Sequence, residues 1–233
     1  MRWLNSLKET FRTLGVRNGL WLIVHRVLGK VSKGRARVFR YYLVAQPIPQ
    51  VANGQLRATA SSVVRRVEGD DPHVSDFPRP HHVIARRFDS GAHCYVAEVK
   101  GRFAGYLWLA YGGYDEDEVR CRFEFAEPAA SVWDFDVYVV PEFRMGRTFV
   151  RLWQTANTEL ASQGVAWTFS RISAFNPMSM SSHQRMGMRS LFMATFLCIG
   201  PLQVAMMGVA PFVHIGWAPG HRPVLKLPLP EAA

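Results

Sequence analysis

The sequence predicts a mixed α/β fold, in which a sheet with both antiparallel and parallel strands is covered by helices. Residues 132–140 alternate between apolar and polar side chains, which is the period of a strand with two unlike faces. Apolar residues then recur at helical spacing over residues 144–162. A further strand, a short helix and an apolar strand follow over residues 165–199. This order of elements is typical of a layered domain with one core sheet.

Residues 1–45 are predicted to be a basic, amphipathic helical segment. Apolar side chains repeat at helical spacing before Gly15, and residues 20–28 form a second apolar helix. Residues 1–50 contain ten Lys and Arg against Glu9 alone, in a chain whose net charge is +10. Apolar helices flanked by basic residues suit the surface of an anionic membrane. The alternative is that both helices pack on the domain and their charges face solvent.

Other functions of this segment are less well supported by the sequence. The apolar stretch at residues 20–28 is shorter than the ~20 residues that span a bilayer. Nucleic-acid binding is not expected, because no nucleic-acid reading module accompanies the basic residues.

Residues 46–60 contain two Pro, an Asn-Gly pair and small residues, and are predicted to connect this segment to the main domain, residues 61–233. The domain is expected to begin with a strand at residues 62–68 and a short helix at 80–88. A hairpin follows at residues 93–99 and 103–111, and a strand at 119–125. Residues 190–220 contain no Lys, Arg, Asp or Glu, and Gly and Pro interrupt them. A buried strand followed by an apolar loop is therefore expected there.

The cysteines and histidines do not predict a metal site. Cys94, Cys121 and Cys198 are widely spaced and are expected to be free thiols in a reducing compartment. Adjacent histidines on a helix point about 100° apart, so His81 and His82 do not form a ligand pair with a matching spacing. With no signal peptide recognised, a cytoplasmic location is expected.

The turn between the strand at 132–140 and the following helix is a candidate phosphate site. It contains Arg144, Met145, Gly146, Arg147 and Thr148. Backbone N–H groups at the start of a helix point toward a bound anion, and the helix dipole favours negative charge there.

A second motif makes this prediction more specific. Residues 176–188 place Asn176, Ser179, His183, Met186, Gly187 and Met188 at spacings that resemble the last motif of the GNAT acyltransferase superfamily. Val139, Pro141, Glu142, Phe143 and Arg144, followed by Leu152, resemble the acyl-CoA motif of the same family. Arg147 and Phe149 stand where that family usually has glycines, so the path of the turn departs from the pattern. The resemblance covers residues 60–199.

The resemblance implies transfer of an acyl group from a CoA thioester to an amine. Val139 and Val140 would contact the thioester carbonyl and the pantetheine, and the amides of residues 144–148 would hold the pyrophosphate. Asn176 and Ser179 would contribute to CoA binding, although Asn176 is equally well placed to cap its helix.

His183 occupies the position where the family commonly has a tyrosine that protonates the thiolate. With an ordinary pKa of ~6.5, an imidazole can donate that proton near neutral pH. The alternative is a histidine that only packs. Asp134 and Asp136, on the predicted polar face of the strand, are candidate bases, with a salt bridge or a cap as the alternative for each.

Together these features predict an N-acyltransferase that uses acetyl-CoA or a longer acyl-CoA and no metal. A peripheral position on the inner membrane face is expected from residues 1–45. The uncharged residues 190–220 favour an apolar acceptor, such as an amine on a lipid or lipid-linked sugar, or a long acyl donor. Two alternatives stay open: a non-catalytic GNAT-like module that docks on a membrane or protein partner, and a soluble acetyltransferase. The sequence does not predict the oligomeric state.

Overall fold

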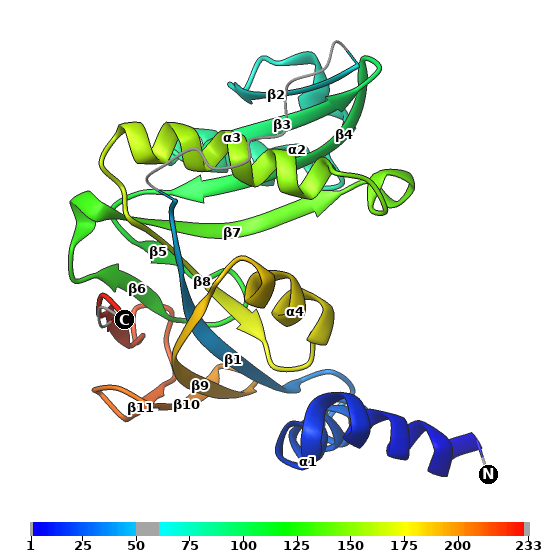
Figure 1. Ribbon diagram of the computed structural model, residues 1–233. Helices are drawn as coiled ribbons and strands as arrows, with labels where there is room; N and C mark the ends of the chain where they lie inside the picture. The colour runs from blue at the N-terminus through cyan, green and yellow to red at the C-terminus, as the bar shows by residue number, and fades with distance from the viewer. Residues whose placement is uncertain (1, 50–60, 231–233) are drawn as a thin grey trace. The chain divides into compact units, whose positions relative to one another are not determined.

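A computed structural model describes residues 2–49 and 61–230, with side chains from residue 7 onward in the first range. Most of the predicted connector, residues 50–60, therefore lies outside the described residues. The chain forms two compact units (Figure 1). Unit one consists of residues 1–46, 114–126 and 170–233, and unit two of residues 47–113 and 127–169.

Unit two is built on a mixed sheet with helices on both faces. Its strands are β2 (Ser62–Val67), β3 (His93–Val99), β4 (Arg102–Ala110), β7 (Ser131–Val139) and the beginning of β8 (Trp167–Ser173), in the spatial order β2-β3-β4-β7-β8. The helical elements are η1 (Pro72–Asp76), α2 (His81–Asp89), η2 (Pro128–Ala130), η3 (Pro141–Phe143) and α3 (Thr148–Ser162). The ladders from β2 to β7 are antiparallel, whereas β7 and β8 pair in parallel.

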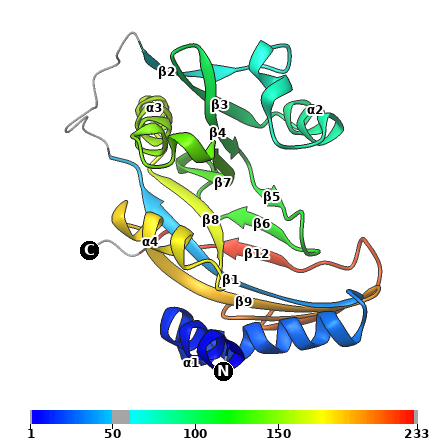
Figure 2. The ribbon, with the colours of Figure 1, turned by 90° about the vertical axis from the view of Figure 1, so that its right-hand side faces the viewer.

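The sheet of unit two separates two apolar layers. Figures 1 and 2 show α3 on one face and α2 on the other. The buried stripe of α3, which includes Leu152, Ala156 and Leu160, packs on β2, β3 and β4. On the α2 face, Ile84 and Phe77 join an aromatic cluster that contains Trp108. Within this sheet β7 lies between β4, its antiparallel partner, and β8, its parallel partner.

Unit one contains α1 (Arg2–Val31), α4 (Pro177–Arg185) and two sheets. The larger has the order β11-β10-β9-β1, with the end of β8 on the other side of β1; its strands are β1 (Ala36–Pro47), β9 (Arg189–Ile199), β10 (Leu202–Met207) and β11 (Val213–Gly216). The smaller has the order β12-β6-β5, formed by Val224–Leu227, Arg122–Phe125 and Tyr114–Asp115.

The two faces of β1 have different partners. On one face, Arg40 lies 5.5 Å from the ring of Trp21 in α1. On the other, the Tyr41 hydroxyl donates a 2.7 Å hydrogen bond to Glu118, and Arg171 forms ion pairs with Glu116 and Glu118. In Figure 2, α1 and the strand β6 lie on opposite sides of β1. The larger sheet of unit one is therefore the middle layer of this unit.

The predicted mixed α/β fold with an N-terminal helix is confirmed. The helix break at Gly15 is also confirmed, since its φ of 73° and ψ of 169° are not helical. The prediction of a loop after residue 199 is wrong, because residues 202–207 and 213–216 are strands β10 and β11. The prediction that residues 1–45 are helical is wrong for residues 36–45, which belong to strand β1 because they pair with β9, a segment distant in sequence. Among the described residues, no helix is long and apolar enough to cross a membrane.

Candidate functional site

The candidate phosphate turn joins β7 to α3 in unit two. β7 ends at Val139, the 3₁₀ turn η3 follows, and α3 begins at Thr148, four residues later than predicted. Residues 144–147 are exposed, and Met145 is 98% exposed. Of the predicted cofactor residues, residues 144–147 are therefore open to solvent, whereas Val139 and Val140 are half-buried and Thr148 is buried.

The first turn of α3 is suited to an anion. The N-cap residue of α3 is Arg147, and among the described residues its side chain forms no capping hydrogen bond with the helix. The first turn of α3 contains no acidic residue. A helix normally satisfies its first N–H groups with the side chain of Ser, Thr, Asp or Asn at this position. Uncapped N–H groups and the positive end of the helix dipole favour a phosphate or another anion at this point.

The backbone N–H groups of Val139 and Val140, at the end of β7, point in different directions. The N–H of Val140 donates a 2.9 Å hydrogen bond to the Ala104 carbonyl of β4. Since N–H groups alternate in direction along a strand, the N–H of Val139 points away from β4. Of the two, Val139 is thus the residue whose N–H is directed to the side of β7 away from β4. Its carbonyl accepts a 3.0 Å bond from Nε of Arg144.

Gly105 of β4 allows β7 to approach closely at this point. It pairs with Val139, and a Cβ atom at residue 105 would lie 2.3 Å from the carbonyl oxygen of Tyr138. Such a contact is far inside the van der Waals limit. The requirement for glycine at residue 105 is not visible in the sequence, because it arises from a strand that is distant along the chain.

The departures from the family pattern are accommodated in the turn and helix. Arg147 is exposed, whereas Phe149 is half-buried, with its ring 6.4 Å from that of Trp153. Gly146 donates its N–H to the carbonyl of Phe143 within the turn. Phe149 thus belongs to the packing of α3, and Arg147 adds a positive charge beside the uncapped N–H groups.

The two aspartates of β7 do not share a face, contrary to the sequence analysis. Trp108 pairs with Asp136 and Leu109 with Asp134, so Phe135 is the extra residue of a β-bulge. Directly paired residues point to the same face, and Trp108 and Leu109 point to opposite faces of β4. The predicted polar face is therefore wrong, because the bulge reverses the alternation between residues 134 and 136.

Asp136 is an ionised carboxylate held by several donors. Arg79 donates to both of its oxygens at 3.0 and 3.2 Å, Arg87 donates at 2.9 Å and the Tyr106 hydroxyl at 3.0 Å. Burial by itself raises the pKa of Asp136, but the bonds and charges of Arg79 and Arg87 outweigh burial, so the pKa is lowered. A carboxylate with a lowered pKa and occupied lone pairs is a weak base. The geometry of Asp136 thus matches the salt-bridge alternative given for this residue. The side chain of Asp134 is buried, with an exposed fraction of 5%.

The second motif lies in unit one, on α4. Asn176 is the N-cap residue of α4, and its side-chain oxygen accepts a 3.1 Å bond from the N–H of Ser179. The structure thus places Asn176 and Ser179 together and assigns the capping role to Asn176. A contact of either residue with CoA stays a prediction.

His183 is on the buried side of α4 and is 7% exposed. Burial lowers its pKa to about 4, because desolvation disfavours the charged imidazolium. The ordinary pKa assumed in the sequence analysis is therefore wrong. At neutral pH about one ring in a thousand is protonated, so an imidazolium at this position is a scarce proton donor.

A cavity of about 310 Å³ lies beside α4 in unit one. Its wall contains Leu14 and Asn18 of α1, Tyr42 of β1, and Asn176 and Met180 of α4. The lining combines carboxamides and hydroxyls with apolar side chains and contains no ionisable group other than the tyrosine. Such a lining suits a neutral, polar or amphipathic molecule.

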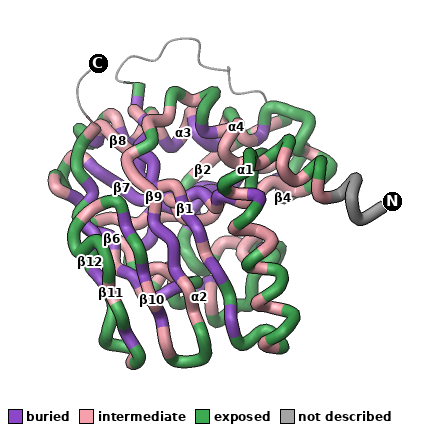
Figure 3. The backbone as a smooth tube through the Cα atoms, turned by 90° about the horizontal axis from the view of Figure 1, so that it is seen from below, coloured by how far each residue is buried: buried purple, intermediate pink, exposed green. Residues whose placement is uncertain are grey.

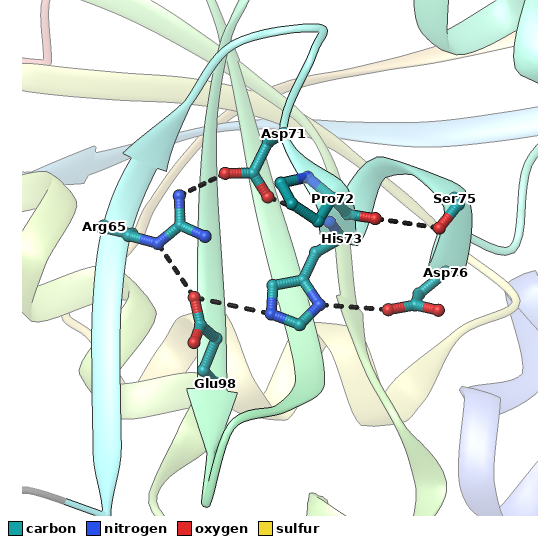
Figure 4. A network of polar contacts seen from close by, with 7 residues as sticks. All are labelled: Arg65, Asp71, Pro72, His73, Ser75, Asp76 and Glu98. Carbon is teal, nitrogen blue, oxygen red and sulfur yellow. Dashed lines mark hydrogen bonds and ion pairs between the residues drawn. The ribbon is translucent and has the colours of Figure 1, made fainter.

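The histidine and carboxylates of η1 form a structural network (Figure 4). Asp71 caps η1 and is ion-paired with Arg65, which also bonds to Glu98 at 2.9 Å. His73 lies between Asp76, at 3.1 Å, and Glu98, at 3.6 Å. The hydrogen bond from Arg65 lowers the pKa of Asp71. In the described ranges, no group of three or more His, Cys, Asp or Glu side chains is placed to hold a metal ion.

The chain was compared with protein-family models, curated proteins and solved structures. No family model and no curated protein matches the chain. Solved structures that are similar include a tandem GNAT protein from the clavulanic acid biosynthesis pathway, with a TM-score of 0.47 and 15% identity over 66% of this chain and 50% of that one. A protein of Novosphingobium aromaticivorans described as a GNAT-family acetyltransferase has a TM-score of 0.43 and 19% identity, over 69% and 65% of the two chains.

A protein of Drosophila is also similar, with a TM-score of 0.47 and 12% identity over 70% of this chain and 52% of that one. The chain thus spans about half the length of two of these matched proteins. At these identities and TM-scores the similarity carries no conclusion about this chain, so the fold and the activity are argued from its own residues.

Proposed function

We propose that the chain is a GNAT-type N-acyltransferase, which transfers an acyl group from acyl-CoA to a primary amine. The observation that carries the proposal is the N-terminus of α3, which has no side-chain cap and follows an exposed turn at residues 144–147 that contains Arg144 and Arg147. The motif at residues 139–144 and the second motif at residues 176–188 support the same activity.

The proposed roles follow from the directions of the backbone groups. The N–H groups at the start of α3 bind the pyrophosphate, assisted by the charge of Arg147. The N–H of Val139 hydrogen-bonds to the thioester carbonyl and polarises it. The amine nitrogen then attacks this carbonyl and loses a proton, the carbon–sulfur bond breaks, and the thiolate leaves and takes up a proton.

In this proposal Asp136 and Arg144 have roles that differ from those expected from the sequence. Asp136 positions Arg79 and Arg87 rather than accepting the proton of the amine, because its pKa is lowered and its oxygens are occupied. Arg144 must release the Val139 carbonyl if the pantetheine is to pair with it, since the two are bonded at 3.0 Å. The acceptor is an amine on a lipid or lipid-linked sugar, and the acyl group is acetyl or longer.

The test is equilibrium binding of acetyl-CoA and of a long-chain acyl-CoA to the full chain, by isothermal titration calorimetry. Arg147→Glu is expected to weaken the affinity for acetyl-CoA about tenfold, because it replaces a positive charge at the pyrophosphate with a negative one. Arg86→Glu is the matched control, since Arg86 is exposed on α2 in the same unit. Failure of the folded wild-type protein to bind either thioester would contradict the proposal.

A non-catalytic GNAT-like module is the second candidate. The bond between Arg144 and the Val139 carbonyl favours it, because this bond occupies a backbone group that the pantetheine would use. In that case Arg144→Gln leaves the biological activity intact, whereas loss of α1 abolishes it. An acyltransferase that acts in solution would instead retain turnover with a soluble amine in an assay that contains no lipid.

A further inference from the structure

The outer side of α1 carries a continuous apolar stripe. After the break at Gly15, five aliphatic side chains are between 41% and 79% exposed: Val16, Leu20, Val24, Val27 and Val31. At 3.6 residues per turn, their spacing places them within an arc of about 80° around the helix. We call these five residues the apolar stripe.

The opposite side of α1 is attached to the sheet of unit one. Asn18 bonds to the Tyr42 hydroxyl at 2.9 Å, and Nδ1 of His25 lies 2.8 Å from the Val38 carbonyl oxygen. The mean direction of Asn18, Trp21 and His25 is about 130° from the centre of the apolar stripe. The stripe therefore points away from the sheet, and the packing of α1 on β1 does not explain it.

Exposed basic residues border the apolar stripe. Arg17 lies just beyond one edge of the arc, and Lys30 and Arg26 lie beyond the other. Lys33, Arg35 and Arg37, which follow α1, are also exposed. The sequence contains no Asp or Glu between Glu9 and Glu68. The stripe is thus bordered by positive charge on both sides and by no negative charge from its own segment.

A second apolar patch lies on the same face of the sheet. Through the register, Arg40 pairs with Thr195, Thr195 with Met206, and Met206 with Val213. Paired side chains point to one face, so Val213 points to the side that carries α1. Met206 and Val213 are 41% and 60% exposed. Figure 3, viewed from below, shows α1 beside β1, with β9, β10 and β11 on the side away from α1.

We propose that α1 docks the protein on the surface of an anionic bilayer, with the apolar stripe inserted at the level of the headgroups. An interfacial helix combines an apolar face with Lys and Arg at its borders, and it lies in the plane of the membrane without crossing it. A second copy of the chain is a poorer occupant, because it would bring the same positive segment into contact. The proposal does not depend on the acyl-transfer reaction.

The test is flotation of the full-length protein with vesicles of phosphatidylcholine alone and of an equimolar mixture of phosphatidylcholine and phosphatidylglycerol. Binding is expected to the anionic vesicles and to decrease with salt. The double variant Leu20→Gln, Val24→Gln is expected to reduce the partition coefficient at least about tenfold, since the bilayer would no longer bury two aliphatic side chains. Arg26→Gln and Lys30→Gln are each expected to reduce it about fivefold.

The matched control is Val63→Gln, because Val63 is 44% exposed on β2 of unit two and lies outside the stripe. Glutamine is a good helix former, so the stripe variants should have the same circular dichroism spectrum and the same melting temperature as the wild type. Absence of binding to anionic vesicles, or equal binding of the wild-type protein and the double variant, overturns the proposal. A wild-type dimer that the double variant converts to a monomer also overturns it, in favour of a second copy as the occupant.

Discussion

The protonation of His183 is the property of the candidate site that can be tested most directly. Burial lowers its pKa to about 4 in the folded protein, whereas an unfolded histidine has a pKa of about 6.5. Between these pH values the unfolded chain binds a proton at this ring and the folded chain does not. The free energy of unfolding therefore increases with pH in this window, and the contribution of His183 to it is lost as the pH falls.

The size of the effect follows from the two pKa values. The full difference corresponds to about 3 kcal/mol, of which about 2 kcal/mol is lost between about pH 7.5 and pH 5. The measurement is urea unfolding, followed by tryptophan fluorescence, over this pH range for the wild type and His183→Gln. The wild type is expected to lose about 2 kcal/mol more than the variant.

Other titrating groups do not obscure this comparison. The pKa values of Asp71 and Asp136 are lowered, so their contributions are lost below the ordinary carboxyl pKa of about 4. Burial also lowers the pKa of His93, but that group is common to both proteins. Equal pH dependence of the two proteins, or an NMR titration of His183 with a midpoint near 6.5, would refute the argument.

Three further substitutions test the geometry around β7 and η1. Gly105→Ala should destabilise the fold by about 2 kcal/mol in thermal unfolding, because its Cβ meets the Tyr138 carbonyl. A melting temperature equal to that of the wild type would contradict the close approach. Asp136→Asn should lower the free energy of unfolding by about 3 kcal/mol, since Arg79 and Arg87 lose their shared carboxylate. A loss of kcat by several orders of magnitude at unchanged stability would instead identify Asp136 as the base. Asp71→Asn, which keeps an N-cap residue but removes the ion pair with Arg65, should cost about 1 kcal/mol in urea unfolding, and a larger effect would contradict it.

Local periodicity was sufficient for the central part of the chain. The alternation at residues 132–140 and the helical spacing that follows predicted the existence of β7 and α3, although the β-bulge changed which side chains of β7 share a face. Because Asn is a good N-cap residue, helix capping was one of the two roles predicted for Asn176. The hydrogen bond from the N–H of Ser179 shows that Asn176 does cap the helix. The motifs at residues 139–144 and 176–188 likewise directed attention to the turn.

Features that depend on distant segments were not predictable in this way. Strand β1 contains Arg40, which is 4% exposed, and its bonds to Thr195 and Asn18 and its contact with the Trp21 ring involve segments distant in sequence. The β-bulge at Phe135 is visible only in the pairing with β4.

The sequence by itself determined the order of elements around the turn, the basic N-terminal segment and the residues of the two motifs. The tertiary structure decided which of these groups are chemically available. It engages the N–H of Val140 with Ala104, surrounds Asp136 with donors and desolvates His183. The physical reason is that burial, charge and hydrogen bonding at a residue are set by segments that fold against it, whereas periodicity is set by its neighbours in the chain.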